Sequence, residues 1–413
     1  MYDLQQPLAL HPLVYLEDGD DVTVGRRDIE SYAVFPPDGA ELVRKLAEGV
    51  APAQAARWYE GRYGEAVDID DVVGVLHELE FVRAAEGARE GAAEGTPEQS
   101  SGPPGALPPV RWQRLGQALF SRVAFTAYGV LVVWAVVAAV RAPELRPNFR
   151  HIFYIDYYSV IQATLFVAAV PLLLLHESFH ALAGRRLGLP SRLSIGRRLY
   201  FIVLETSMDS LVTVPRRQRY LPILAGMLAD VLAMAALTVL ADLTRAPDGS
   251  LSLAGRFCLA VSFATLLRVA WQFSFYLRTD LYVLVSTVLG CVDLHGAVKG
   301  TLANRVNRLL GRTDRLRDET AWHPVDRRVA HWYAWLVPVG YAISLTTLAL
   351  AVLPVTWFMF SGVFTRFTDG GTATQVLDST VFLAFSLIPI AVYGLLALRD
   401  RRRGRVREKG RVS

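Results

Sequence analysis

The residues best suited to chemistry are three ionisable side chains within one five-residue segment, His176-Glu177-Ser178-Phe179-His180. Residues four apart lie on the same face of a helix, so both imidazoles can bind one metal ion. Glu177 lies on a neighbouring face, where its carboxylate can take a proton from water as a general base. The segment directly follows an uncharged run, where ionisable groups are costly, and this favours a functional role over histidines that only join helices by hydrogen bonds. The pattern predicts metal-assisted hydrolysis.

A catalytic zinc site needs three protein ligands and one open position, and Asp280 is the best candidate for the third ligand. It ends one apolar segment and begins another, at the same end of its span as the two histidines. Histidine and carboxylate ligands in an apolar site suit Zn²⁺. The alternative is that Asp280 pairs with Arg278 at the membrane interface. Asp293 and His295 are competing ligands, which we expect to be solvated.

The elements that position these residues must be membrane helices, because the chain is 52% hydrophobic and only 20% charged. A soluble domain carries about 25% charged residues. A helix that crosses a bilayer needs about 20 apolar residues. Six segments meet this need: 123–140, 157–175, 220–241, 257–277, 332–360 and 379–398. The sequence therefore predicts a polytopic α-helical membrane protein with about six transmembrane helices.

The net charge of +4 divides into two parts of opposite sign. Residues 1–110 carry 8 Lys or Arg against 21 Asp or Glu, and residues 111–413 carry 35 against 18. Eight basic residues lie in each of three segments, 185–219, 296–332 and 399–413, and at most three in each alternate loop. With six spans this places both termini in the cytoplasm of a cell-membrane protein. The basic tail is interpreted as an anchor to anionic lipid.

Residues 1–83 are predicted to form a small α+β domain of winged-helix-like type. Two short strand patterns precede three segments with apolar residues at helical spacing: 22–24 and 31–35, then 39–46, 52–63 and 68–79. The net charge of −13 over residues 1–110 would repel phosphates, so no nucleic-acid partner is expected. Residues 84–110, rich in Ala, Glu, Gly, Pro and Ser, are predicted to be a flexible linker. Residues 111–300 would form the zinc core, and residues 301–413 two further spans and the basic tail.

The segment HESFH on a membrane helix resembles the first signature of the site-2 proteases, which are intramembrane zinc metallopeptidases. Residues 225–230 (AGMLAD) resemble their Gly-Pro-x-x-Asn segment, and residues 278–282 (RTDLY) resemble their Asp-Gly segment. The resemblance implies a helical membrane core whose ligands and active groups fall on residues of this chain. These are zinc ligands His176, His180 and Asp280, the catalytic residue Glu177, and substrate-binding residues Gly226 and Asp230.

The chain departs from the site-2 protease pattern at three positions. Met227 stands where a proline is usual, Asp230 where an asparagine is usual, and Leu281 where glycine is common. Asp230 therefore has a second interpretation, an intramembrane ion pair with Arg268.

Residues 8–82 resemble the small chaperone of pyrroloquinoline-quinone biosynthesis. The similarity lies in PPDGAELVRKLAEGVAPAQAARWYEGRYG and DIDDVVGVLHELEFV. That fold recurs as the element that recognises the leader of ribosomally made, modified peptides (RiPPs). The resemblance implies a leader-peptide partner, which such elements bind as an added strand at a sheet edge.

Together the two resemblances predict an intramembrane zinc metalloprotease that cleaves a RiPP precursor, similar to the metalloproteases encoded with daptide-type peptides. Two alternatives stay open. One is a site-2-type protease that releases a membrane-bound transcription regulator. The other is a non-enzymatic peptide exporter or immunity protein with a vestigial zinc motif.

Overall fold

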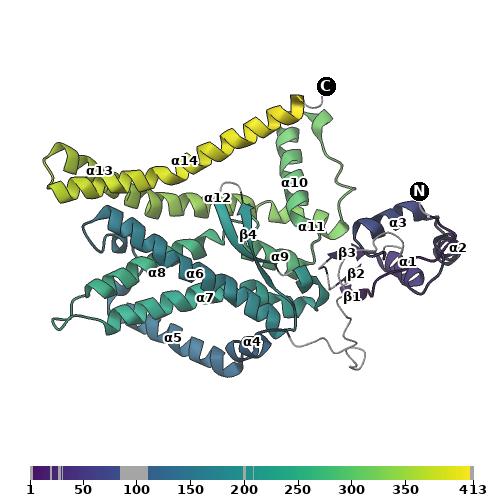
Figure 1. Cartoon of the computed structure of the whole chain (residues 1–413), viewed down its shortest axis with the longest axis horizontal. Coiled ribbons are helices and arrows are strands. Elements are labelled where there is room, and N and C mark those ends of the chain that lie inside the picture. The colour runs from purple at the N-terminus through teal and green to yellow at the C-terminus, as the bar shows by residue number, and fades with distance from the viewer. Residues whose placement is uncertain are drawn as a thin grey trace, which may run out of the picture.

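The computed structural model describes residues 3–18, 21–26, 29, 31–83, 110–198, 201–207 and 209–409. It is mostly helical, with a small N-terminal unit beside a body of long helices (Figure 1). The predicted linker over residues 84–110 lies outside the described residues, apart from Val110.

The N-terminal unit is a three-stranded antiparallel sheet followed by three helices. The strands β1 (Val14–Asp18), β2 (Asp21–Arg26) and β3 (Ser31–Phe35) pair in that order, and the helices are α1 (Pro37–Ala47), α2 (Pro52–Tyr63) and α3 (Ile69–Glu78). Residues from both layers form a core of their own, centred on Val24, Val43, Leu46, Leu76 and Phe81. The sequence predicts β2, β3 and the three helices but not β1.

The body begins with α4 (Gln113–Leu119), and its remaining elements follow in chain order. They are α5 (Arg122–Arg141), η1 (Pro143–Leu145), η2 (Phe149–Ile152), α6 (Tyr158–Arg186), β4 (Arg192–Arg198), β5 (Phe201–Ser207), η3 (Asp209–Thr213), α7 (Arg216–Leu243), α8 (Leu253–Trp271), α9 (Asp280–Leu289), α10 (Leu294–Leu309), η4 (Thr313–Arg315), α11 (Pro324–Tyr333), α12 (Leu336–Thr347), η5 (Leu348–Val352), α13 (Leu353–Thr368) and α14 (Ala373–Lys409). The strands β4 and β5 pair as an antiparallel hairpin.

Five helical segments of the described chain are long and apolar enough to cross a membrane. They are α5, α6, α7, α8 and the continuous stretch from α12 through α13. A sixth is counted if α9 and α10, bent by 93° at a short break, form one span. Several membrane-length helices are thus confirmed, but one predicted boundary differs. The predicted span 257–277 stops being helical at Trp271. The predicted span 379–398 lies inside α14.

Helix α7 lies at the centre of the body and packs against α5, α6, α8 and α9. Small residues on its surface allow this close approach: Ala225 and Ala229 pack against Phe179 and Ala183 of α6. By contrast, α5 turns several valines outward, namely Val123, Val130, Val133, Val136 and Val140. An apolar outer face with a small-residue centre is the arrangement expected of helices surrounded by lipid.

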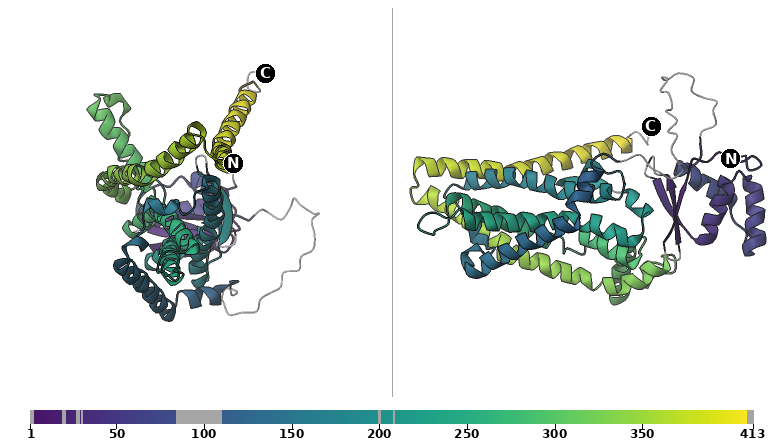
Figure 2. Two further views of the ribbon diagram at one scale, coloured as in Figure 1. Left: turned by 90° about the vertical axis from the view of Figure 1, so that its left-hand side faces the viewer. Right: turned by 90° about the horizontal axis from the view of Figure 1, so that it is seen from below.

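The basic segments of the body lie at one end of it. In Figure 1 the β4–β5 hairpin, α10, α11 and the C-terminal end of α14 lie towards the same end of the body as the N-terminal unit. The right-hand view of Figure 2 also shows the C-terminal end of α14 on that side. The sheet of the N-terminal unit lies between the body and α1–α3 (Figure 2). Residues far apart in the sequence are thereby gathered at the end that carries most of the arginines.

Candidate metal centre

The two histidines of the HESFH segment lie one turn apart on α6, a continuous helix of 29 residues. The apolar run that precedes them favours a membrane helix. The i, i+4 spacing of the two histidines places both rings on the same side of it. His176 and His180 are each 5% exposed, and their Nε2 atoms are 3.2 Å apart.

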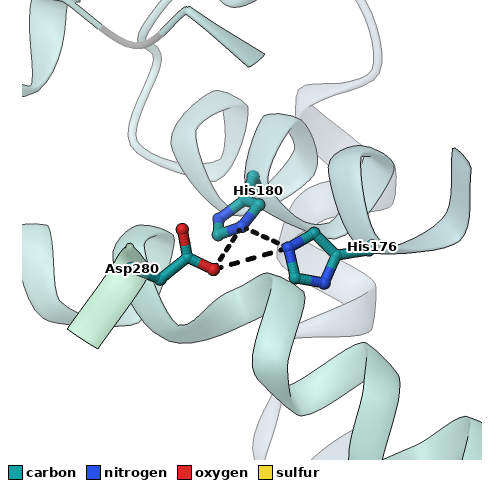
Figure 3. Close-up of side chains that lie close together, drawn as sticks. All are labelled: His176, His180 and Asp280. Atoms are coloured by element: carbon teal, nitrogen blue, oxygen red, sulfur yellow. Dashed lines mark hydrogen bonds and ion pairs between the residues drawn. The ribbon is translucent and has the colours of Figure 1, made fainter. Parts of the chain in front are cut away.

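Asp280 lies at the end of a short loop that connects two helices, and its side chain points towards the histidines. Helix α8 ends at Trp271, and α9 begins at Asp280 with Thr279 as its N-cap, whose hydroxyl accepts the Tyr282 N–H at 3.4 Å. The same hydroxyl donates to the Gln272 carbonyl at 2.8 Å, which closes the loop between the helices. Asp280 Oδ2 therefore lies 3.4 Å from each of the two Nε2 atoms (Figure 3).

These three atoms all present lone pairs to one another. His176 Nδ1 lies 3.0 Å from Asp230 Oδ2, and His180 Nδ1 lies 2.8 Å from the Pro222 carbonyl oxygen. Both outer partners are acceptors, so each neutral imidazole carries its proton on Nδ1 and turns an unprotonated Nε2 inward. Two imidazole nitrogens and a carboxylate oxygen thus converge with no donor hydrogen among them, which is the donor set that a cation satisfies.

The spacing of the three atoms fits a single tetrahedral ion. Ligands that lie about 2.0–2.1 Å from one tetrahedral metal are about 3.4 Å from each other. The three separations here are 3.2, 3.4 and 3.4 Å. Among the described residues, His176, His180 and Asp280 form the group of histidine, cysteine and acidic side chains that could hold a metal ion.

Each of the three side chains is oriented by a partner outside the group. Asp230, which is 1% exposed, bonds to His176 and also forms an ion pair with Arg268 of α8. The side-chain amide of Gln272 bonds to Asp280. Partners of this kind fix the tautomer and direction of metal-binding side chains. The ion pair considered for Asp230 is therefore present, and the same carboxylate also orients a histidine.

Gly226 lies directly against the two imidazoles. A Cβ atom at this position would be 2.2 Å from His180 Nε2 and 2.5 Å from His176 Nε2, closer than side chains tolerate. The backbone of α7 therefore forms one wall of the centre, and only glycine fits there. A role for Gly226 or Asp230 in binding substrate stays a prediction.

Glu177 is buried beside the group and meets the β4–β5 hairpin. The Thr206 N–H donates to Glu177 Oε2 at 2.9 Å, and the Thr206 hydroxyl lies 2.9 Å from the same oxygen. Within the described part of the chain, no hydrogen bond to Glu177 Oε1 is formed by another side chain. One oxygen of the carboxylate is thus held by the hairpin.

The competing acids and histidine lie elsewhere. Asp293 caps α10 by accepting the Gly296 N–H at 3.1 Å, and its side chain is 66% exposed. His295 packs edge-on against Tyr282. Arg278, considered as a partner of Asp280, has Asp293 within 3.9 Å instead. The side chain of Asp280 is 26% exposed, whereas those of the two histidines are 7% and 6% exposed, so protein covers the centre least on the side of Asp280.

Sequence reasoning missed three contributors to this centre: Thr206, Gln272 and the Pro222 carbonyl. The residues 201–204 (FIVL), followed by a polar Glu-Thr-Ser, carry a strand signal that could have located β5 inside a loop otherwise identified only as basic. The roles of Gln272 and Pro222 depend on contacts between distant segments, and no local pattern marks them.

Comparison of the chain with known protein families, curated proteins and solved structures finds no match. The structure itself thus defines a protein with several membrane-length helices and a buried His-His-Asp group able to hold a metal ion.

Proposed function

We propose that the protein is an intramembrane zinc metallopeptidase of the site-2 protease type. The observation that carries this proposal is the convergence of His176 Nε2, His180 Nε2 and Asp280 Oδ2 at tetrahedral spacing, with a carboxylate from the next residue of α6 beside them. Three protein ligands leave the fourth position of a zinc ion open, as in catalytic rather than structural sites.

The residues of the chain take distinct roles in peptide-bond hydrolysis. His176, His180 and Asp280 would hold the ion, which when bound supplies the Lewis acidity that polarises a carbonyl and makes water more acidic. Glu177 Oε1 accepts the proton of the attacking water and then gives it to the leaving amine. Asp230 and Gln272 keep the ligands in place.

The substrate that we propose is a ribosomally made precursor peptide, from which the enzyme removes the leader. The N-terminal sheet offers two outer strands, β1 and β3, and extended peptides can bind as an added strand at such an edge. Because the N-terminal unit and the metal centre belong to one chain, a peptide bound by the first is held at a high effective concentration near the second.

The proposed location is the cell membrane, with both termini in the cytoplasm. This proposal is supported by the gathering of the basic segments and the N-terminal unit at one end of the body. Reporter fusions after residue 413 and within the loop 244–252 test it: only the second should report the outer side.

Cleavage of precursor peptides by the full-length, detergent-solubilised protein tests the function. Short peptides encoded beside the gene are incubated with the wild type and Glu177→Ala, and products are read by mass spectrometry alongside zinc content. We expect cleavage by the wild type only, with zinc retained in the variant. Glu144→Ala, which removes an exposed acid at the other end of the body, serves as the control and should cleave normally.

Other results would favour the alternatives. If the protein cleaves a membrane-bound regulator but no precursor peptide, the site-2-type protease that releases a regulator is favoured. If the wild type binds no zinc and cleaves no peptide, a role in peptide export or immunity is favoured.

A further inference from the structure

The hairpin β4–β5 lies between α6 and α7 in the chain, and Thr206 of β5 contacts Glu177. Thr206 presents both its N–H and its hydroxyl to Glu177 Oε2, and its hydroxyl also lies 3.1 Å from the Glu177 carbonyl oxygen. A carboxylate held by two donors at one oxygen has little rotational freedom, and its other oxygen points in a fixed direction. Thr206 is therefore placed to orient the proposed base.

The turn η3 follows β5 almost immediately, and it is fixed to the body. Ser210 is 1% exposed, and its hydroxyl donates to the Pro190 carbonyl at 3.2 Å. Leu211 is buried against Leu189 and Ile223, the latter on α7. Any movement of η3 would thus be passed to β5, whose last residues are Thr206 and Ser207.

The N-terminal sheet rests on this same turn. Strands β1 and β3 both contact η3. A second contact joins Asp21 at the start of β2 to His323, just before α11, with 3.4 Å between Oδ2 and Nε2. Figure 2 shows the sheet as the part of the N-terminal unit that faces the body. The unit is acidic and the body basic, so their charges favour this docking.

We propose that Thr206 is a positioning residue for Glu177, and that docking of the N-terminal sheet on η3 holds Thr206 in place. The N-terminal unit would then have two roles. It would raise the peptide concentration near the metal centre, and it would also help to position Glu177. This inference rests on the proposed function, in which Glu177 moves the proton. Two effects of the N-terminal unit can then be told apart. Tethering of the leader lowers KM for substrates that carry a leader, whereas correct positioning of Glu177 raises kcat even for a short peptide without a leader.

The docking contact can be broken and restored by exchanging charges in the full-length protein. Asp21→Arg removes the acid that faces His323, and His323→Asp places two acids at this contact, whereas the double variant restores an oppositely charged pair. Asp70→Arg makes the same change of charge on an exposed position of α3 and is the matched control. Two readouts apply: hydrogen exchange of the β5 and η3 amides in metal-free protein, and kcat and KM for a leaderless peptide.

We expect faster exchange in β5 and η3, and a kcat reduced about 3- to 10-fold at unchanged KM, for each single variant. The double variant and Asp70→Arg should match the wild type. Thr206→Val should lower kcat about 10-fold with zinc content unchanged, while Thr206→Ser should retain activity because it keeps the hydroxyl.

Exchange that is the same in Asp21→Arg and the wild type would overturn the coupling between the two units, whatever the activity. A normal kcat in Thr206→Val would overturn the positioning role. Failure of the proposed function is a separate result, since a wild type equal to Glu177→Ala would show no peptidase activity while the exchange data still report on docking.

Discussion

Gln272 holds Asp280 at two points. The side-chain Nε2 of Gln272 donates to Asp280 Oδ2 at 3.0 Å, and its Oε1 accepts the Asp280 backbone N–H at 3.1 Å. The amide thus joins the end of α8 to the first residue of α9 and sets both the backbone and the carboxylate of Asp280. These two bonds restrain the loop between α8 and α9, and they fix the position of the proposed ligand atom, Asp280 Oδ2.

Replacing Gln272 with Leu should weaken zinc binding. The change removes both hydrogen bonds while keeping similar bulk, so Asp280 loses its orientation. Loss of such a partner lowers metal affinity about 10- to 100-fold. Competition with a zinc-binding dye measures the affinity, and Gln162→Leu, an amide on α6 that faces Ser386 instead, is the control. Equal affinities in the two variants would contradict the role given to Gln272.

Replacing Gly226 with Ala should block the centre without unfolding the protein. The added methyl group would overlap both Nε2 atoms, and the rings cannot turn away because Asp230 and Pro222 hold their Nδ1 atoms. We expect zinc content after purification to fall to background. Alanine is otherwise favoured over glycine in a helix by about 0.5–1 kcal/mol. Gly129→Ala on α5, where a Cβ has open space, should keep normal zinc content. Normal zinc in both variants would show that Gly226 does not face the metal.

The parts of this centre that a sequence can predict are those carried by local patterns. His176 and His180 are linked by helical spacing, so one helix suffices to place them. Asp280 lies 100 residues further on, and its candidacy came from its place between apolar segments and from a family resemblance. The structure brings its Oδ2 atom to the two histidines.

The parts that could not be predicted depend on where helices end and on contacts between segments. Hydropathy continues through residues 272–277, so the pattern extends the span to residue 277. The chain instead leaves the helix at Trp271, because Gln272 and Thr279 form side-chain bonds that replace helical ones. Hydropathy indicates which segments are apolar but not whether they form helix, strand or loop. The sequence therefore does not predict β4, β5 or the contact of Thr206 with Glu177.

Substitutions at Asp230 and Arg268 should distinguish two roles of the Asp230 carboxylate, the ion pair with Arg268 and the hydrogen bond to His176. Arg268→Met leaves a buried charge without its partner, which costs roughly 3–5 kcal/mol for a fully buried pair and less here because Arg268 is one-quarter exposed. The double variant Asp230→Leu, Arg268→Met removes both charges and should recover much of that stability. It should not recover zinc affinity, because His176 has then lost its acceptor. Thermal unfolding and dye competition measure the two quantities. A double variant that binds zinc like the wild type would limit Asp230 to the ion pair.

Replacing Asp378 with Asn should reveal what the last two helices contribute. Asp378 on α14 accepts the N–H groups of Tyr158 and Ser159 at the start of α6, at 2.8 and 2.9 Å, and pairs with Arg366 of α13 at 2.8 Å. This residue therefore ties α13 and α14 to the helix that carries the histidines. The loss of charge should cost roughly 2–3 kcal/mol and lower the melting temperature, because hydrogen bonds to a charged acceptor are worth more than neutral ones.

Asp369→Asn, which changes an exposed acid of the preceding turn, is the control and should have no measurable effect. Zinc affinity of the folded protein should stay within about threefold, since about 27 Å of helix separates Ser159 from Glu177. A loss of zinc affinity at temperatures where the protein is folded would instead show that α13 and α14 help to set the geometry of the metal centre.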